Sequence, residues 1–311
     1  MRKTFINTLI ELAEKDRNLY LLTGDLGFSI LEEFAEKFPK QFINCGIAEQ
    51  NMMGVAAGLA LSGKKVYTYS IIPFVTMRCL EQIRNDFCFQ NLDVKIVGYA
   101  TGLSYGAQGT THHAIEDIGI LRALPNMTVL SPADSIEAKE LILQSYKTKN
   151  PTYIRLDKGG RENLYSFKPN IILGKPSVLK EGKDGIIIAT GSYLEIGINI
   201  IKKLEQKGYD FKLISMHTLK PIDSASLLKE IEGKKLIFTL EEHNIIGGLG
   251  SAVAEILLAN NINDIMFRSI GVDDRYPDIA GDQNYLRSYY KIDEQSIYNL
   301  IINYLTNGKE D

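Results

Sequence analysis

The sequence predicts an α/β protein made of two domains, each built on a mainly parallel sheet. Short runs rich in apolar and β-branched residues alternate with longer segments of helical spacing, and this alternation occurs on both sides of a stretch rich in turn residues. A chain of 311 residues, 45% hydrophobic and 23% charged, is long enough for two cores. We therefore expect one domain over residues 1–165 and a smaller one over residues 166–311.

The first domain is expected to begin with a helix, because MRKTFINTLIELAEKD alternates apolar and polar residues at helical spacing. This segment lacks the unbroken apolar core of a signal peptide. Strands follow at residues 19–23, 65–69, 93–99, 128–131 and 152–156. Helical segments separate these strands, which favours a parallel arrangement.

The segment GGRENLYSFKPNIILGKP, from about residue 159 to 176, is rich in turn residues and charge, and we interpret it as the linker. The second alternation has strands at residues 185–190, 211–215, 234–240 and 265–270. After the third of these, the turn GGLG leads into a helix. It is not a dinucleotide fingerprint, so we expect its glycines to serve tight turns and packing.

Composition and charge exclude several classes of function. The formal net charge is −3 with both signs interspersed, so no basic face predicts a nucleic-acid or anionic-membrane partner. No segment approaches the length of a membrane span. The three cysteines show no spacing typical of zinc sites or disulfide frameworks. We expect a cytoplasmic protein that acts on small substrates.

Glu49 is the first candidate for catalysis. It stands at the start of an otherwise small and apolar helical segment within INCGIAEQNMMGVAAGLALS, residues 43–62. A carboxylate is costly to bury unless something pairs with it, so its presence needs an explanation. The alternative is an acidic residue in the first helical turn, where the helix dipole favours it.

Four strings in order give the chain a resemblance that covers nearly all of it. They are GIAEQNMMGVAAGLALSG, GAQGTTHHAIEDIGILRALPNMTVLSPAD, HTLKPID and TLEEHNIIGGLGSAVAE. The chain resembles the C-terminal half of the transketolase family, in which a pyrimidine-binding domain precedes the transketolase C-terminal domain. The resemblance implies thiamine diphosphate as cofactor and transfer of a two-carbon ketol unit from a ketose, or ketose phosphate, to an aldose.

The resemblance also assigns residues to the cofactor. The family glutamate matches Glu49, whose carboxyl would bind the ring nitrogen of the aminopyrimidine and act in acid–base catalysis through the cofactor. Phe74 matches the aromatic that packs on the pyrimidine, whereas Ile71 and Met77 stand where further aromatics are usual, and core packing is the better interpretation for these two. The cofactor-binding residues that we expect are Glu49, Phe74, Ile71, Asp25 and Arg78.

Two adjacent histidines precede a helix. The resemblance implies that His112 reaches the hydroxyls of the donor substrate and moves protons, a role that suits imidazole near neutral pH. His113 either assists or caps the helix that follows, and loop residues on a wet surface are the alternative for both. The substrate-binding residues that we expect are Arg2, Ser29, His112, His113, Gln108 and Lys158.

The substrate positions depart from ordinary transketolases. Arg2 and Ser29 match residues that hold a terminal phosphate, although Arg2 could instead be a frayed, exposed residue. Ala100 replaces a phosphate-binding histidine, and Lys158 replaces an arginine, so phosphate recognition should be looser because lysine is a point charge rather than a fork. Gln108 replaces an aspartate that reads an acceptor hydroxyl. The standard pentose phosphates are therefore in doubt as substrates.

No GDG motif followed by the family's asparagine appears in the sequence, although the family uses this motif to hold Mg²⁺ and the diphosphate. The strings TGDLG and AGDQN suit ordinary turns. We therefore expect a partner chain, the N-terminal transketolase subunit, to ligate Mg²⁺, with two copies of each polypeptide and the cofactor across an interface. This polypeptide alone should be inactive.

Three alternatives remain open from the sequence. A beta subunit of a 2-oxo-acid dehydrogenase decarboxylase component has the same two domains and also needs a partner. A deoxyxylulose-phosphate synthase-like enzyme shares the string GIAEQ. A non-catalytic scaffold subunit is the third possibility, and it has no chemical reason to keep both Glu49 and His112.

Overall fold

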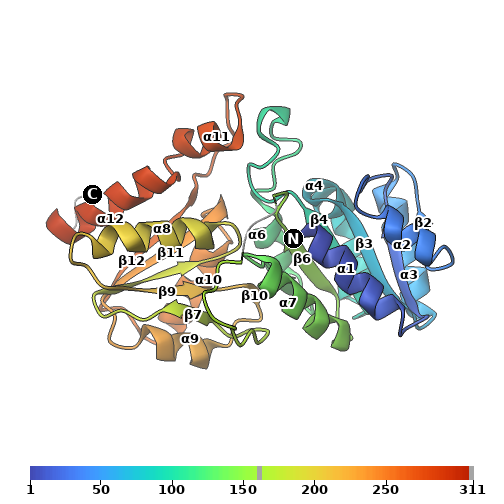
Figure 1. Ribbon diagram of the computed structural model, residues 1–311, viewed down its shortest axis with the longest axis horizontal. Helices are drawn as coiled ribbons and strands as arrows, with labels where there is room; N and C mark the ends of the chain where they lie inside the picture. The colour runs from blue at the N-terminus through green and yellow to red at the C-terminus, as the bar shows by residue number, and fades with distance from the viewer. Residues whose placement is uncertain (160–162, 308–311) are drawn as a thin grey trace.

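The computed structural model describes residues 1–159 and 163–307. They form two β-sheets, each flanked by helices, that lie side by side (Figure 1). The α/β class predicted from the sequence, with two sheets along the chain, is confirmed. The boundary at residue 165 stays a prediction.

The first sheet has the strand order β10-β5-β6-β4-β3-β1-β2. Neighbouring strands run parallel except β10, which pairs antiparallel with β5 and comes from the far side of the predicted linker. The strands are β1 (Leu19–Thr23), β2 (Phe42–Asn44), β3 (Lys65–Ile71), β4 (Val94–Tyr99), β5 (Thr128–Leu130), β6 (Thr152–Leu156) and β10 (Thr218–Lys220). The α-helices around it are α1 (Arg2–Ala13), α2 (Glu32–Lys37), α3 (Glu49–Leu61), α4 (Ile72–Val75), α5 (Leu80–Gln82), α6 (Asp117–Ala123) and α7 (Ser135–Lys147). Three short turns of other helical types are η1 (Met77–Cys79), η2 (Ile83–Cys88) and η3 (Gly106–Gln108).

The second sheet has the order β12-β11-β8-β9-β7, and only β7 runs antiparallel to its neighbour. Its strands are β7 (Ser177–Lys180), β8 (Gly185–Ala189), β9 (Phe211–Ser215), β11 (Leu236–Asn244) and β12 (Met266–Val272). Its helices are α8 (Tyr193–Glu205), α9 (Ser224–Ile231), α10 (Leu249–Ala259), α11 (Gln283–Tyr289) and α12 (Glu294–Asn307). No helix among the described residues combines the length and apolar character needed to cross a membrane.

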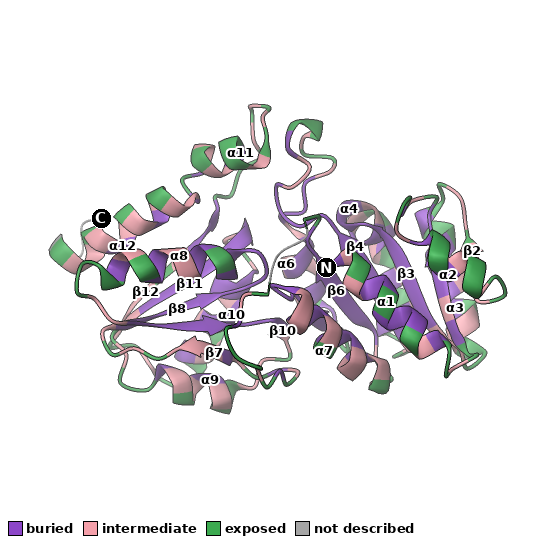
Figure 2. Cartoon of the chain, viewed as in Figure 1, coloured by how far each residue is buried: buried purple, intermediate pink, exposed green. Residues whose placement is uncertain are grey.

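Both faces of the first sheet are covered by helices, so its central strands are buried on both sides. All six residues of β4 are buried, as expected for a parallel strand between two layers. The side chains of α1 and α7 pack on one face, and those of α3 pack on the other. Figure 2 shows the buried residues along the strands and the exposed residues on the outer sides of the helices. The fold therefore leaves the ends of the strands as the places where polar side chains can gather.

The two sheets meet around one buried carboxyl, that of Glu137 in α7. It accepts hydrogen bonds from the Ala133 backbone N–H at 2.7 Å, the Tyr165 hydroxyl at 2.5 Å and the Ser215 hydroxyl at 2.6 Å. Tyr165 belongs to the predicted linker and Ser215 to β9, so the carboxyl of Glu137 ties one buried linker residue to the second sheet. Residues 160–162 of that linker lie outside the described residues.

Glu137 makes the stability of the chain depend on pH. Burial raises the pKa of this carboxyl from 4.5 to about 7, so the folded chain holds this proton more tightly than the unfolded chain does. The contribution of Glu137 to the free energy of unfolding is therefore fully present below pH 4.5 and is lost as the pH rises through about 7. Glu137→Gln keeps a neutral group that can both accept and donate. We expect the melting temperature of this variant, relative to wild type, to increase across that range.

Thermal unfolding of both proteins over the same pH series measures this difference. Burial lowers the pKa values of His217 and His243 to about 4, which makes stability change with pH in the opposite sense. Both proteins share these histidines, so their contribution cancels in the comparison. The exposed Glu140 on the same helix supplies the control Glu140→Gln. A difference in melting temperature that stays constant with pH would contradict the prediction.

Candidate active site

The predicted site residues gather at one edge of the first sheet. Because β1, β3, β4 and β6 are parallel, their carboxyl ends meet at the same edge, and the loops that follow them form a common surface (Figure 1). Asp25 follows β1, Phe74 follows β3, His112 lies in the loop after β4, and Lys158 follows β6. Glu49 opens α3, directly after β2.

Glu49 is buried and paired. Its side chain is 2% exposed, and Arg78 Nη1 donates a hydrogen bond to Oε2 at 2.7 Å. Gly24 lies against it, since a Cβ atom there would stand 3.2 Å from Glu49 Cγ. The other carboxyl oxygen, Oε1, has no hydrogen-bond partner among the described residues. Burial and a free oxygen go beyond what a favourable place in the helix dipole requires.

An aromatic surface leads from Glu49 to His112. The Arg78 guanidinium lies 4.1 Å from the Phe74 ring centroid, and the edge of the Phe74 ring meets the His112 imidazole at 5.2 Å. The centroid of the Tyr105 ring also lies 5.3 Å from that of His112. His112 is partly exposed, and its Nδ1 lies 3.0 Å from the Thr111 hydroxyl. The imidazole therefore contacts two aromatic rings and remains partly accessible to a ligand.

His113 points the other way. Its side chain is buried, and Nε2 contacts the Gly106 carbonyl at 2.9 Å, while Nδ1 has no partner among the described residues. Burial lowers the pKa of this imidazole, which favours the neutral form. The predicted capping role is wrong, because Glu116 precedes α6 and no side chain caps it. His113 instead ties its own loop together.

Two other residues predicted to bind the cofactor differ in burial. Ile71 is 5% exposed and packs in the core beneath α1, which favours packing over ligand contact. Asp25 is exposed and exchanges two hydrogen bonds of 3.0 Å with Asn44, one through its backbone N–H and one through Oδ1. This pair joins the loops after β1 and β2 beside Glu49.

Two of the residues predicted to bind the substrate, Arg2 and Lys158, are cations that lie over neighbouring tyrosine rings. The Arg2 guanidinium lies 5.2 Å from the Tyr99 ring centroid, and Lys158 Nζ lies 4.5 Å from that of Tyr105. The two tyrosine hydroxyls are 3.4 Å apart. Neither cation has a carboxylate partner among the described residues. Arg2 is half-buried at the start of α1, so the alternative of a frayed residue is wrong. The arrangement suits an anionic group on a ligand.

The other positions compared with the family pattern, Ala100, Ser29 and Gln108, offer no side chain that is placed like these two cations. Ala100 is fully buried and has a φ of +72°, so its methyl group cannot replace a phosphate-binding side chain. Ser29 also has a positive φ, +63°, and its backbone N–H donates to Glu32 Oε1 at 2.6 Å, which occupies that donor. Gln108 is exposed in η3. Non-glycine residues with positive φ concentrate where function demands an unusual backbone.

The glycine-rich turn GGLG is packed as expected. Glu241 accepts hydrogen bonds from the backbone N–H groups of Leu249, at 2.7 Å, and Gly250, at 2.8 Å. A carboxylate therefore already occupies the N-terminus of α10, where a phosphate would otherwise bind.

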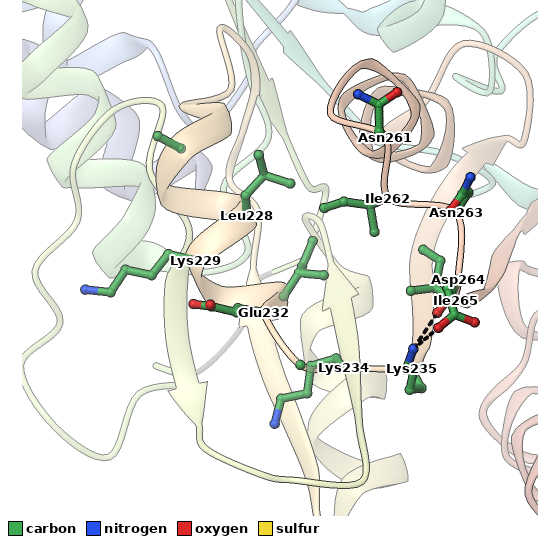
Figure 3. Close-up of a pocket in the computed structure, with 13 residues that line it drawn as sticks. Leu228, Lys229, Glu232, Lys234, Lys235, Asn261, Ile262, Asn263, Asp264 and Ile265 are labelled. Atoms are coloured by element: carbon green, nitrogen blue, oxygen red, sulfur yellow. Dashed lines mark hydrogen bonds and ion pairs between the residues drawn. The ribbon is translucent and has the colours of Figure 1, made fainter.

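A surface pocket lies far from this edge. This pocket of about 570 Å³ is lined by α9 and by residues 232–235 and 261–265 (Figure 3). It stands at the amino ends of β11 and β12, opposite to the edge where ligands bind in open α/β sheets. Lys235 and Asp264 pair with each other at its rim, so their charges are already matched. We do not count it as a candidate active site.

Comparison with known families agrees with this geometry. The transketolase pyrimidine-binding domain matches residues 1–161, and the transketolase C-terminal domain matches residues 174–297. The chain belongs to the transketolase family. It corresponds to the C-terminal half of that family, as the sequence predicted.

Several similar proteins have about the same length as this chain. A putative transketolase C-terminal section of Methanocaldococcus jannaschii is 39% identical and aligns over 96% of this chain and 93% of its own length. One of the subunits of the apulose-4-phosphate transketolase of Phocaeicola vulgatus is 35% identical, over 95% of this chain and 94% of its own. A solved structure described as a split gene transketolase, inactive beta4 tetramer, has a TM-score of 0.86 at 35% identity and covers 99% of this chain and 98% of its own.

Membership of the transketolase family implies thiamine diphosphate as cofactor. The residues of this chain fit its aminopyrimidine ring, because Glu49 offers a buried carboxyl with one oxygen that has no partner among the described residues, and Phe74 offers an aromatic face next to it. Within residues 1–159 and 163–307, no group of three or more His, Cys, Asp and Glu side chains could hold a metal ion.

Some residues at this transketolase site were not found from the sequence. Tyr99 and Tyr105 lie beneath the two cations, and Glu242 and Arg287 of the second domain lie behind the His112 loop. Tyr99 ends a predicted strand, which is a weak signal for a ligand site. Glu242 lies in the string TLEEHNIIGGLGSAVAE but was given no role there, and Tyr105 and Arg287 gave no signal of their own, so only the fold brings these residues to the site.

Proposed function

We propose that this chain is the C-terminal subunit of a split transketolase. With an N-terminal partner subunit, it transfers a two-carbon ketol unit from a ketose or ketose phosphate to an aldose. The observation that carries the proposal is the continuous surface from the buried Glu49, over Phe74, to His112. Bound thiamine diphosphate supplies the electron sink that this chemistry needs.

The roles of the chain's own residues follow from their positions. Glu49 holds a proton at the ring nitrogen of the pyrimidine, and Phe74 packs against that ring and keeps water from it. His112 takes a proton from, or returns one to, a hydroxyl of the sugar. Arg2 and Lys158 attract an anionic end of the sugar. The similarity to an enzyme subunit named for apulose 4-phosphate supports a phosphorylated substrate.

The exposed side of α3 supports a partner chain. Gly54 and Gly58 have open space where a Cβ atom would stand, although a glycine in an exposed helix costs about 1 kcal/mol relative to alanine. Ile47 and Leu61 extend the same region and are 81% and 63% exposed. Small residues on a helix allow another backbone to approach closely. We infer that the N-terminal subunit packs here, supplies the ligands of Mg²⁺, and forms a heterotetramer with two copies of each chain.

Reconstitution tests the proposal. The chain is purified alone and together with its partner subunit from the source cells, and each sample is assayed with thiamine diphosphate, Mg²⁺, a ketose phosphate donor and an aldose acceptor. We expect ketol transfer from the complex and none from the chain alone. The similar solved structure is described as an inactive beta4 tetramer, which supports the second expectation.

Parallel assays separate the alternatives. Pyruvate with an aldehyde acceptor detects a deoxyxylulose-phosphate synthase-like reaction, and a 2-oxo acid with an oxidant and lipoamide detects a dehydrogenase component. A complex that is folded and inactive in all three assays would favour the scaffold. Ketol transfer by the chain alone would overturn the requirement for a partner.

A further inference from the structure

We propose that Glu242 and Arg287, which lie in the second domain, are positioning residues for His112. They hold the base of the segment that carries this histidine, residues 100–116, named here the His112 loop. The proposal rests on the proposed function only for its activity measurement, because the position of the loop can also be observed directly.

Glu242 forms a complete buried ion pair at the end of β11. The side chains of Glu242 and Arg287 are 0% and 12% exposed, respectively. Arg287, in α11, donates from Nε to Oε1 at 2.7 Å and from Nη2 to Oε2 at 2.8 Å. Gln283, one turn earlier in α11, adds contacts of 3.1 and 3.0 Å to the same two oxygens. Such a two-pronged pair fixes the carboxylate in both distance and orientation.

The His112 loop rests directly on this carboxylate. Gly102 has a φ of +55°, and a Cβ atom there would lie 2.4 Å from Glu242 Cγ, so only glycine allows this approach. Gly102 and Ala114 exchange two backbone hydrogen bonds, of 3.1 and 2.8 Å, which close the base of the loop. Arg155 Nη2 donates to the Ala114 carbonyl at 2.9 Å and to the Glu242 carbonyl at 3.1 Å. The base of the loop is thus joined to β11 at two points.

The far part of the loop also touches the second domain. A Cβ atom on Gly106 would lie 2.9 Å from the Gly281 carbonyl oxygen, just before α11. The backbone carbonyl of Gly106 itself lies 2.9 Å from His113 Nε2. His113 is therefore tied to the point where the loop meets the second domain, and His112 is its neighbour. Figure 1 shows this loop and α11 extending together above the two sheets.

The consequence is a defined task for the second domain in the active site. The ion pair fixes α11 against β11, and these two elements together support the His112 loop. A displacement of about 1 Å in a reacting group can cost about 100-fold in rate. Arg287 can thus affect turnover without touching the substrate.

The experiment uses ¹⁵N-histidine NMR on the full-length chain. Because the chain has only four histidines, their imidazole resonances can be assigned by single substitutions. We expect Arg287→Met to shift or broaden the resonances of His112 and His113 and to leave His217 unchanged. Arg287→Lys keeps the charge and should shift them less. Arg275→Met is the matched control, since Arg275 contacts Tyr289 of the same helix at 2.7 Å on the exposed side.

The reconstituted complex gives the second measurement. We expect Arg287→Met to lower kcat by about 10- to 100-fold with a small change in the KM of the acceptor, and Arg287→Lys to recover part of the loss. A purely structural role would lower the melting temperature and leave kcat per folded complex unchanged.

Two results would overturn the proposal. One is a folded Arg287→Met chain with unchanged His112 and His113 resonances, and the other is an unchanged kcat. Removing Arg287 leaves a buried charge, so Glu242→Gln/Arg287→Met provides a neutral second variant if the single one does not fold. The double variant is expected to show the same shifts. If the wild-type complex is inactive, the proposed function fails, and the NMR comparison still decides the role of the ion pair.

Discussion

Glu49→Gln is expected to lower the kcat of the reconstituted complex by about 10³- to 10⁴-fold, toward the upper end of what acid–base catalysis contributes. Glutamine keeps the size of the side chain and its acceptor oxygen for Arg78. It cannot exchange a proton with the pyrimidine ring nitrogen. The loss should appear in kcat because a group of the same shape still fills the site.

The same substitution should leave the fold intact. Among the described residues Glu49 forms an ion pair only with Arg78, whose side chain is 43% exposed, so the arginine can turn to water when the carboxylate is lost. Circular dichroism and the melting temperature measure this. Glu33→Gln is the matched control, because Glu33 lies on another helix and pairs with an exposed lysine, Lys37, at 2.9 Å. Near-normal kcat for Glu49→Gln would remove Glu49 from catalysis, and an unfolded variant would give it a structural role.

The strands that the sequence predicts best are those buried on both faces. LYLLT and TYIRL coincide with β1 and β6, since a parallel strand between two helical layers is rich in apolar residues; Arg155 in β6 is a buried exception, paired with Asp117. The strands β2, β7 and β10 were not predicted, and each has only three or four residues. Segments of this length carry too little periodicity to identify a strand reliably, although β5, also of three residues, was predicted at residues 128–131. The pairing of β2, β7 and β10 depends on neighbours distant in the sequence.

The residues of the candidate site also fall into two groups: those that the sequence predicted and those that only the structure revealed. Glu49 and His112 lie in two of the four strings that resemble the family, Phe74 matches a family aromatic, and the structure brings the three onto one edge. Tyr105 and Arg287 lie outside those strings, and Glu242 lies in the fourth string but was given no role. Arg287 is 45 residues from Glu242 in the chain, and only the packing of α11 on β11 brings them together. Sequence patterns thus predicted the residues for which we propose a chemical task, whereas the residues that support them could be found only in the fold.

His112→Ala is expected to lower kcat/KM for a ketose phosphate by about 10²- to 10³-fold, because the imidazole that moves the proton of a sugar hydroxyl is removed. The donor can be changed to test this reason. Hydroxypyruvate yields the same two-carbon unit by losing carbon dioxide, so its departing fragment carries no hydroxyl that must lose a proton. The kcat/KM of the variant for this donor, which covers only the steps up to release of carbon dioxide, should therefore fall much less.

The comparison of the two donors separates chemistry from structure. Thr111→Val is the control, because it removes only the exposed hydroxyl that contacts His112 Nδ1 at 3.0 Å and leaves the contacts of the imidazole with Phe74 and Tyr105. An equal loss with both donors would mean that His112 only shapes the surface around the cofactor. A loss of kcat/KM confined to the ketose phosphate would assign the proton transfer to His112, since only that donor must lose a proton from a hydroxyl on the carbon that departs.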